Sequence, residues 1–339
     1  MVPRILVIGN TDHTHIGGSL LRAAAADGIA ASILESHWAD DGSRWRRRFA
    51  WHLHGRKCAH QREFGDWVRR FSDSNKPHLL LSTGFAPLEA SVLRHLRGRG
   101  VITANISTDD PWNPTRRSRW FFEALREYDH IFTPRAHTIP DFQTLPVRNV
   151  HYLPFAYDEM FFFNEALDDA ERAAYRSDVL FAAAADADRL PYLEALQEVN
   201  PAIALYGGFW NRYPAARPIW RGWAPPDVLR KATLSTKVSV CLARRSNRDQ
   251  HAMRTFELPA TGSCMAVEDT PDHRRIFGAD GECVRFFKSP SELSAVVSGL
   301  LEHEEERHSL AAEAHLRVTE GHHTYRDRLE TILQTAGLG

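Results

Sequence analysis

Short apolar runs alternate with amphipathic segments along most of this chain. Residues 5–8 form an unbroken apolar run, typical of a strand buried in a parallel sheet. A glycine-bearing stretch follows at residues 9–18, and residues 19–27 then carry leucine and alanine at helical density. Gly28 ends this predicted helix, and residues 29–34 supply the next strand. The order of strand, glycine loop, helix and strand predicts a βαβ unit.

The same alternation continues through the rest of the sequence. Further strands are predicted at residues 77–82, 101–106, 130–133 and 150–153, and then at 177–182, 202–206, 237–242, 263–267 and 283–286. Helices are predicted at residues 88–96, 168–172, 190–198, 226–232 and 253–261, with helical chain from residue 290 to the end. Strands that alternate with helices in this way form doubly wound parallel sheets, which bind ligands at the carboxyl ends of their strands.

A stretch without strand signals separates two strand–helix series of similar length. We therefore expect an α/β protein with a Rossmann-like domain at residues 1–155, a connection at 156–176 and a second Rossmann-like domain at 177–320. The length of 339 residues also favours two domains. Residues 321–339 are expected to form a C-terminal helix that crosses back to the N-terminal domain.

Composition narrows the class of protein further. Hydrophobic residues make up 43% and charged residues 25% of the chain, as in ordinary globular domains. The net charge is −1, so no global field attracts nucleic acid, and a nucleic-acid partner is not expected. Four cysteines without C-x-x-C spacing are typical of free thiols in a reducing compartment. With neither a targeting signal nor a membrane-length apolar run, we expect a cytoplasmic protein with at most peripheral membrane contact.

One segment departs from this neutral average. Between Arg44 and Arg70 there are nine basic residues and two acidic ones, a local net charge of +7. Trp45, Phe49 and Leu53 in this segment have the spacing of one helix face. The segment is either a helix with an apolar face in the core and a solvated basic back, or a docking surface for an anionic acceptor or a membrane.

The most specific motif is R-T-F-E-L-P-A-T-G at residues 254–262, which opens a helix after a predicted strand. An arginine and backbone N–H groups at a helix N-terminus can hold a diphosphate, and a carboxylate one turn later can accept both hydroxyls of a ribose. An R-x-x-E pair by itself is more often a surface salt bridge. Here the motif is followed in order by I-F-G at 276–278, E-L at 292–293 and H-T-Y-R-D-R at 323–328.

This ordered series resembles the C-terminal domain of GT-B glycosyltransferases, in particular the CgeB-like (spore maturation protein-type) group related to glycosyltransferase family 4. The N-terminal half fits the same resemblance through T-D-D-P at 108–111, Y-D-H-I-F-T at 128–133 and Y-L-P at 152–154. The resemblance implies a GT-B fold, in which two Rossmann-like domains face each other across a cleft. It also implies a UDP-, GDP- or TDP-linked sugar as co-substrate and neither a metal nor any other cofactor.

The resemblance assigns the donor-binding residues by position. Glu257 matches the glutamate that binds the nucleotide ribose, Arg254 a residue near the donor phosphates, and Trp223 the place where a loop cradles the nucleobase. Gly262 is expected to let its helix pack on the sheet. The remaining assignments are Gly17 and Gly18 in a glycine loop near the diphosphate, and Arg189 with Arg244 or Arg245 as further cations.

Two positions depart from the family pattern. The common retaining pattern has two glutamates eight positions apart, and the earlier one is Asp249 here. Residues 182–185 are alanines where a glycine often follows the strand. Asp186 and Asp188 form a D-x-D, which holds a metal in another glycosyltransferase fold and which we interpret here as a loop or cap.

Three residues are candidates for catalysis. His15 lies just after the first predicted strand and is a candidate general base with a suitable pKa; the H-x-H that it forms with His13 lacks further zinc ligands in the sequence. Asp109 and Asp110 follow a strand and precede Pro111, which excludes helix there. One of them is expected to orient the loop while the other meets a sugar or an acceptor hydroxyl; capping of the following helix is the alternative.

The predicted activity is the transfer of a sugar from a nucleotide-diphosphate sugar to a hydroxyl-bearing acceptor. Anionic, lipid-linked and natural-product acceptors are all compatible with the segment between Arg44 and Arg70. Retention of configuration follows only from the resemblance, and inversion stays open if His15 or Asp110 is a base. A nucleotide-sugar epimerase of the same two-domain fold and a non-catalytic GT-B scaffold are the alternatives.

Overall fold

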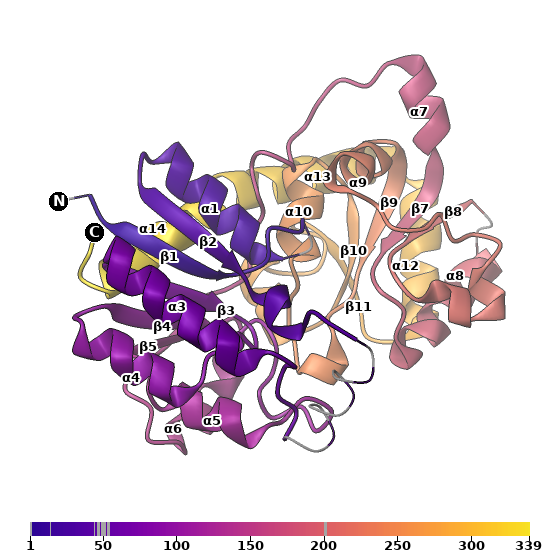
Figure 1. The fold of residues 1–339 in the computed structure, drawn as a ribbon. Helices are drawn as coiled ribbons and strands as arrows, with labels where there is room; N and C mark the ends of the chain where they lie inside the picture. Colours follow the sequence, from indigo (N-terminus) through magenta and orange to yellow (C-terminus); the bar gives the residue numbers. More distant parts are fainter. Residues whose placement is uncertain are drawn as a thin grey trace. The chain divides into compact units, whose positions relative to one another are not determined.

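The computed structural model describes residues 2–13, 15–43, 45, 48, 52, 55–199 and 202–339. The chain divides into two compact units (Figure 1). The first comprises Met1–Pro154, Ser246–Arg248 and Tyr325–Gly339, and the second comprises Phe155–Arg245 and Asp249–Thr324. Three residues from a loop of the second half of the sequence therefore belong to the N-terminal unit, as does the last helix.

The first unit is built on a parallel six-stranded sheet in the order β2-β1-β3-β4-β5-β6. Its strands are β1 (Arg4–Gly9), β2 (Ala30–Glu35), β3 (Leu79–Thr83), β4 (Ile102–Ile106), β5 (His130–Thr133) and β6 (Val150–Tyr152). The apolar runs of β1 and β3 are buried on both faces, as expected for central strands of a sheet covered by helices. Every pair of neighbours runs parallel, which confirms the predicted parallel α/β architecture of this half.

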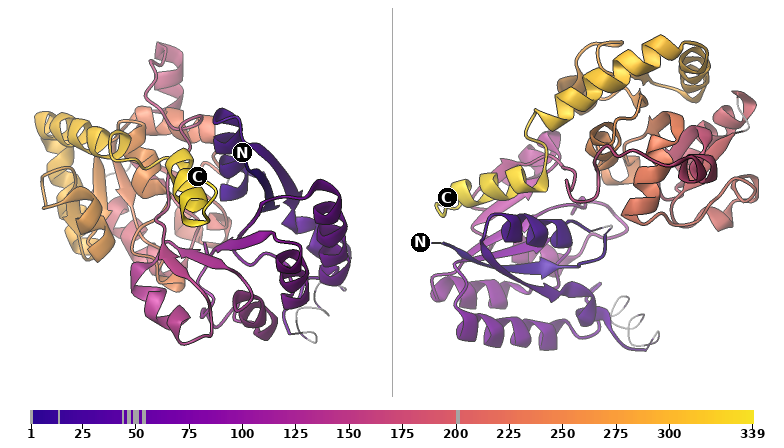
Figure 2. Two further views of the ribbon diagram at one scale, coloured as in Figure 1. Left: turned by 90° about the vertical axis from the view of Figure 1, so that its left-hand side faces the viewer. Right: turned by 90° about the horizontal axis from the view of Figure 1, so that it is seen from above.

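Helices cover both faces of this sheet. They are α1 (Ile16–Ala26), α3 (Gln61–Asn75), α4 (Ala90–Gly98), α5 (Arg119–Leu125), α6 (Ile139–Gln143) and α14 (Tyr325–Thr335), with short 3-10 turns η1 (Ser36–Asp40) and η2 (Ala136–Thr138). The C-terminal α14 packs beside α1 (Figure 2). Helix α3 was not predicted, because the high density of charged residues conceals the apolar face that it forms with Phe64, Val68 and their neighbours.

The second unit contains a parallel five-stranded sheet in the order β11-β10-β9-β7-β8. Its strands are β7 (Ser177–Ala182), β8 (Ile203–Tyr206), β9 (Thr236–Cys241), β10 (Met265–Glu268) and β11 (Arg285–Phe287). One apolar core on this unit includes Phe256 and Phe277, and another includes Phe181, Trp210 and Phe287. The second predicted parallel sheet is thus confirmed as well.

The helices of the second unit follow its strands in alternation. They are α7 (Asp169–Tyr175), α8 (Leu190–Val199), α9 (Pro226–Leu234), α10 (Arg254–Ala260), α11 (Pro271–Phe277), α12 (Pro290–Glu302) and α13 (Glu304–Thr319), with 3-10 turns η3 (Ala187–Arg189), η4 (Trp210–Arg212), η5 (Pro214–Ala216) and η6 (Arg245–Asn247). The acidic helix α7 buries none of its residues, and its N-terminus carries a full capping box between Asp168 and Glu171.

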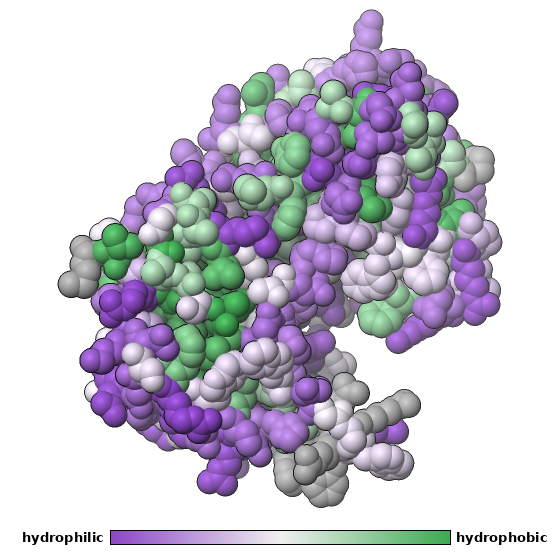
Figure 3. Space-filling model, turned by 45° about the horizontal axis from the view of Figure 1, so that its top comes forward, coloured by the Kyte–Doolittle hydropathy of each residue, from purple (hydrophilic) through white to green (hydrophobic). Residues whose placement is uncertain are grey.

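The chain from residue 290 is helical as predicted, and it is divided into separate helices. The chain forms three helices there, because His303 leaves the helical region at the end of α12 and His322 adopts a φ of +55° between α13 and α14. Within the described residues, no helix is long and apolar enough to cross a membrane. The face of the molecule in Figure 3 is mostly hydrophilic, with several groups of hydrophobic residues among the hydrophilic ones.

Candidate functional site

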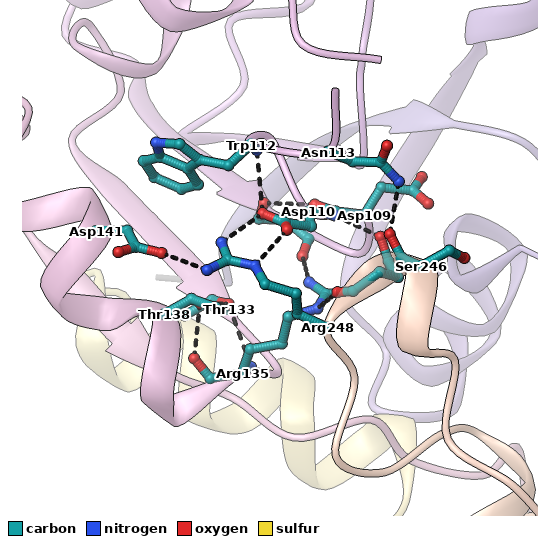
Figure 4. Close-up of polar contacts among 12 residues, drawn as sticks. Asp109, Asp110, Trp112, Asn113, Thr133, Arg135, Thr138, Asp141, Ser246 and Arg248 are labelled. Atoms are coloured by element: carbon teal, nitrogen blue, oxygen red, sulfur yellow. Dashed lines mark hydrogen bonds and ion pairs between the residues drawn. The ribbon is translucent and has the colours of Figure 1, made fainter. Parts of the chain in front are cut away.

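The carboxyl ends of β4 and β5 in the first unit carry a dense polar cluster (Figure 4). Asp110 is only 3% exposed, and Arg248 donates two hydrogen bonds to its carboxylate, from Nε to Oδ2 at 2.6 Å and from Nη2 to Oδ1 at 2.9 Å. Arg248 also reaches Asp141 Oδ2 at 2.8 Å, and Trp112 N–H donates to Asp110 Oδ1 at 3.0 Å. Hydrogen bonding to Asp110 raises the pKa of Arg248 above its ordinary value, so this arginine stays charged.

Asn247 and Arg135 also form hydrogen bonds with the segment that carries Asp110. The Asn247 side chain accepts a hydrogen bond from Asp110 N–H at 2.7 Å and donates to the Thr108 carbonyl at 3.2 Å. The buried Arg135 guanidinium donates to the carbonyls of Asn247, Ser107 and Thr108 at 2.8, 3.0 and 2.6 Å. Arg248 adopts a φ of +52°, which is uncommon for a residue with a side chain and is maintained here by these surrounding contacts.

This cluster gives the two adjacent aspartates different environments. Both oxygens of Asp110 are engaged within the first unit, so this carboxylate orients its loop. Asp109 is half-buried and lies close to Gly84, because a Cβ added at Gly84 would be 3.6 Å from Asp109 Oδ2. The contacts of Asp110 agree with the expectation that one of the two aspartates orients the loop, and a role for Asp109 at a substrate stays a prediction.

The loop between β1 and α1 carries the other catalytic candidates. His15 is the exposed N-cap residue of α1, and its N–H donates to the Asp12 carbonyl at 2.9 Å. His13 lies 3.6 Å from Asp12, which is an exposed pair. Gly18 N–H already donates to the Asn10 carbonyl at 3.1 Å, so this amide serves the loop itself.

Close packing requires that positions 17 and 18, which are Gly17 and Gly18, have no side chain. A Cβ at Gly17 would lie 2.8 Å from the Asn10 carbonyl oxygen, and one at Gly18 would lie 2.9 Å from that of Thr11. Any side chain at these positions would displace the loop from the start of α1. Gly17 and Gly18 lie in the first turn of α1, so the structure places them in the helix that follows the predicted glycine loop. Their contact with a diphosphate remains a prediction.

In the second unit, Arg254 and Glu257 meet on the first turn of α10. The two side chains form an ion pair, and the Glu257 carboxylate is nearly enclosed, since the residue is only 2% exposed. Arg254 is partly exposed and lies over it. A ribose that binds Glu257 would share this carboxylate with Arg254, so the two predicted donor contacts are coupled to each other.

A buried hydrogen-bond chain supports this turn from behind. Thr255 accepts from Ala252 N–H at 3.0 Å and pairs with His273 Nε2 at 2.9 Å, while His273 Nδ1 lies 2.7 Å from the Glu268 carbonyl. Burial lowers the pKa of His273 to about 4, so its imidazole is neutral, with the Nδ1 proton donated to Glu268 and the Thr255 hydroxyl donated to Nε2. The turn that carries Arg254 is thereby held in one conformation.

The side chain of His251, which lies just before α10, also takes part in structural hydrogen bonds. Phe155 N–H donates to His251 Nε2 at 3.1 Å, and His251 Nδ1 lies 2.9 Å from Asp272 Oδ2. With one ring nitrogen accepting, the other carries the proton and donates it to the carboxylate. Both residues are buried, and the pair fixes the start of the second unit at Phe155.

Trp223 lies where a ligand could stack on it. It is 58% exposed, and its indole lies against Gly208, since a Cβ added there would be 2.6 Å from the ring. Gly207 N–H donates to the Gly222 carbonyl at 2.9 Å, which joins the loop after β8 to the loop that carries Trp223. The indole therefore packs against backbone, while more than half of the residue is open to solvent.

The predicted arginines around the donor are not equivalent. Arg189 is buried and donates to the Ala184 carbonyl at 2.7 Å, and burial lowers its pKa. Arg245 is held by Glu268 at 2.9 Å and by the Tyr192 hydroxyl at 2.7 Å. Arg244 is exposed, and Arg245 is exposed too despite these contacts, whereas Arg189 is not.

The remaining predicted residues have local structural roles. Gly262 has a φ of +96° just beyond the end of α10, and a Cβ there would lie 3.2 Å from Asn164, so it terminates the helix. Asp186 caps η3 by accepting from Ala187 N–H at 2.8 Å. Asp249 N–H donates to the Arg244 carbonyl at 3.1 Å.

Several basic residues of the segment between Arg44 and Arg70 are paired or hydrogen-bonded within the protein. Lys57 pairs with Glu89 at 2.7 Å, Arg69 pairs with Asp66 at 2.7 Å, and Arg56 donates to two carbonyls at 2.7 Å. Trp45 is exposed, so at this position the predicted apolar stripe does not face the core. Other residues of this prediction lie outside the described part of the chain, namely Arg44, Arg46, Arg47, Phe49 and Leu53.

Sequence reasoning missed the residues that hold Asp110, which are Arg248, Asn247 and Arg135. Asn247 and Arg248 lie 137 and 138 positions from Asp110, and none of the three residues matches a motif. The one signal available was a run of polar residues after β9. Among the described residues, no three histidine, cysteine, aspartate or glutamate side chains converge as a metal site.

The two parallel-sheet units define the GT-B fold. Sucrose-phosphate synthase from Thermosynechococcus elongatus has this fold with a TM-score of 0.73, at 11% identity over 98% of each chain. Anabaena HepE in complex with UDP-glucose has a TM-score of 0.66 at 8% identity over 99% of each chain. A Listeria monocytogenes protein described as a UDP-N-acetylglucosamine 2-epimerase has a TM-score of 0.62 at 10% identity, over 98% of this chain and 95% of that chain.

Residues 184–334 match the family model of glycosyl transferase-like proteins. No curated protein sequence is detectably similar to this chain. The matched residues contain α10 with Arg254 and Glu257, the arginines after β9, and Trp223.

Proposed function

We propose that this protein is a glycosyltransferase that moves a sugar from a nucleotide-diphosphate sugar to a hydroxyl of an acceptor. The observation that carries the proposal is the Arg254–Glu257 pair on the first turn of α10, inside the segment that matches the glycosyl transferase-like family. An arginine and a carboxylate on one helical turn suit a diphosphate and the hydroxyls of the ribose next to it. The GT-B fold is consistent with this use of the two residues.

The proposed chemistry depends on charge at the leaving group. When the bond from the sugar to the diphosphate breaks, negative charge accumulates on the departing nucleotide, and fixed cations lower the energy of that state. Arg254 and Arg244 are the partly or fully exposed cations assigned to this role. Trp223 is assigned to the nucleobase, with its free indole face stacking on a planar ring.

Asp109 is the proposed group on the acceptor side, with His15 as the second candidate. Asp109 follows β4 at the carboxyl edge of its sheet, and its neighbour Asp110 is already engaged by Arg248. A base at Asp109 would accept the proton of the acceptor hydroxyl as this hydroxyl attacks the sugar. We also propose a CgeB-like enzyme related to family 4, independence from metal and a cytoplasmic location, all of which derive from the sequence. Retention of configuration follows only from the resemblance, and direct attack assisted by a base at Asp109 would instead invert the configuration.

Donor binding is the direct test. Isothermal titration with UDP-, GDP- and TDP-glucose is expected to give a dissociation constant in the micromolar to low millimolar range for one of them, unchanged by EDTA. Arg254→Ala should weaken that binding at least tenfold, whereas Arg285→Ala, at a surface pair with Asp280 and Glu306, should not change it. If none of the three nucleotide sugars binds, the proposal fails.

An epimerase is the second candidate, favoured by the likeness to the Listeria protein described as a UDP-N-acetylglucosamine 2-epimerase. The two activities differ in their need for an acceptor. An epimerase converts UDP-N-acetylglucosamine alone, which proton NMR of the sugar detects, while a transferase releases UDP only with an acceptor or, slowly, with water. A protein that binds the nucleotide sugar without any turnover would be a scaffold.

A further inference from the structure

A stacked pair of tryptophans lies at the carboxyl end of β2 in the first unit. Trp38 belongs to η1, which follows β2 directly, and Trp67 belongs to α3. Their ring centroids are 4.7 Å apart and their planes are inclined by 21°, while Phe64 packs edge-on against Trp67 at 5.8 Å. Trp38 is nevertheless 49% exposed. Since Trp67 covers one indole face, the exposed area of Trp38 belongs to the opposite face and the ring edge.

Hydrogen bonds hold η1, and with it Trp38, against the loop between β1 and α1. Asn10 Oδ1 accepts from the Ser36 hydroxyl at 2.9 Å and from His37 N–H at 3.3 Å. Glu35, the last residue of β2, accepts from the Thr11 hydroxyl at 2.5 Å. This is the loop that ends at His15. The aromatic face is therefore rigid and is attached to the segment that carries a catalytic candidate.

The chemistry around Trp38 selects a class of ligand. A flat indole face attracts the C–H face of a pyranose ring, and hydroxyls around that ring need nearby acceptors and donors. Asp12 and His37 are exposed polar side chains on the two segments that meet here, and Asp41 is an exposed carboxylate three residues after Trp38. Carboxylates accept hydrogen bonds from hydroxyls and repel anions, so the surroundings favour an uncharged polyhydroxylated ring over a phosphate.

We propose that Trp38 is the stacking platform of a binding subsite for the pyranose ring of a neutral saccharide. The inference rests on the proposed function, in which this saccharide is the acceptor and the first unit binds it. Trp67 acts as a positioning residue, because it fixes the orientation of the Trp38 ring without touching the sugar. The acceptor class is then a saccharide, and the basic segment is not its main determinant.

Saturation-transfer NMR on the full chain, without donor, tests the platform with cellobiose, maltose, lactose and N,N′-diacetylchitobiose as probes. At least one disaccharide is expected to receive saturation at its ring protons, and mannitol, which has hydroxyls but no ring face, is expected to receive none. Trp38→Ala should weaken binding of that disaccharide at least tenfold, and Trp38→Phe should retain part of it. Trp45→Ala, at a tryptophan of the same unit that is 81% exposed, is the matched control and should bind like the wild type.

Three outcomes would overturn the inference: none of the four disaccharides binds, mannitol binds equally well, or Trp38→Ala binds like the wild type. Titration of Trp38→Ala with the nucleotide sugar keeps this result separate from the proposed function, because donor affinity should stay within twofold of the wild-type value. It also reports that the variant is folded. If the protein binds a saccharide but no nucleotide sugar, the role of Trp38 is supported and the proposed glycosyltransferase function fails. If it binds a nucleotide sugar but no saccharide, the proposed function is supported and the role of Trp38 fails.

Discussion

Arg248 holds the Asp110 carboxylate at two points, although the residues are 138 positions apart in the sequence. Arg248 lies in a three-residue segment that belongs to the first unit while its sequence neighbours on both sides belong to the second. The parallel N–H groups of a guanidinium match the two oxygens of a carboxylate, which makes the contact directional as well as charged. The ion pair therefore specifies where residues 107–113 and residues 246–248 lie.

Arg248→Ala is expected to destabilise the protein. It leaves a carboxylate that is almost fully buried without its cation, at a cost of about 2–4 kcal/mol, less than for a wholly enclosed pair because Arg248 is partly exposed. Urea denaturation of wild type and variant measures this difference. Arg119→Ala, which breaks an exposed pair with Glu123 four residues away, should cost less than about 1 kcal/mol. Equal losses in the two variants would contradict the role of Arg248.

Substitutions of Asp109 and Asp110 should have different effects on activity and on stability. Asp110→Asn should lower the midpoint of urea unfolding, because the neutral amide loses the charge-assisted contacts with Arg248. Asp109→Asn should leave that midpoint within error and lower kcat by about 100-fold or more, the contribution of a general base. Steady-state kinetics with the acceptor, combined with urea unfolding, distinguishes these results. A stable Asp109→Asn variant with full kcat would remove Asp109 from the mechanism.

Glu257→Gln should weaken donor binding while preserving the fold. The amide keeps the size of the carboxylate in its buried place, but it is a weaker acceptor for ribose hydroxyls and pairs less well with Arg254. We expect donor affinity to fall by about tenfold, which corresponds to 1.4 kcal/mol. Titration with UDP and with uracil separates the causes, since a ribose contact affects only UDP. Unchanged affinity for UDP would exclude the ribose role.

Gly208→Ala tests whether Trp223 holds the nucleobase. The new methyl group would lie 2.6 Å from the indole and must push the ring away, whereas the backbone there has an ordinary φ and the exposed ring has room to move. Affinity for UDP is expected to fall at least fivefold, with little change in the melting temperature. Gly98→Ala adds a methyl group where nothing lies within 4 Å and should leave UDP binding unchanged. Wild-type affinity in Gly208→Ala would argue against Trp223.

Stability should decrease as the solution becomes acidic. Burial lowers the pKa of His130 and of His151, whose ring nitrogens lie 3.1 Å apart on β5 and β6, and Asp129 offsets only part of this effect at His130. Unfolded histidine titrates near pH 6.5, so below that pH the unfolded chain binds more protons than the folded one. The free energy of unfolding therefore falls as the pH drops from about 7 through 6.5 toward the lowered values.

A histidine variant identifies the source of this pH dependence. His151→Gln should flatten the decline of the unfolding free energy between about pH 7 and pH 5, because one of the two lowered groups is gone. His308→Gln, at an exposed position on α13, should leave the decline as it is in the wild type. His130 is still present in this variant, and His273, whose pKa is lowered to about 4 by burial, acts in the same direction, so these two residues account for the slope that remains.

Much of the fold could be predicted from local patterns. The bounds of β5 and β7 are those that the apolar runs indicate, and most helices begin within a few residues of their predicted starts. Helix α3 was missed because its apolar positions are few among charged ones, and only packing against α4 and η1 shows which face is buried. The break after α12 is set by the backbone of His303, which the apolar pattern does not reveal.

The candidate site was predicted less completely. Arg254 and Glu257 could be identified together because one helical turn links them, and a motif records that spacing. The environments of Asp109 and Asp110 could not be distinguished, because the difference between them is made by Arg248, Asn247 and Arg135. The same limit applies to Trp38 and Trp67, which are 29 positions apart and stack only because η1 lies against α3.

The sequence by itself determined that this is an α/β protein with two parallel sheets and a glycosyltransferase-like motif series. Buried strands, helices and motif spacings could be identified because each depends on residues that are close together in the sequence. Only the tertiary structure decided how the Asp110 carboxylate is held, that Glu257 is buried and paired with Arg254, and that Trp67 covers one face of Trp38. Those properties depend on burial and on the meeting of distant segments. Burial and long-range contact are set by the path of the whole chain, so no local pattern contains them.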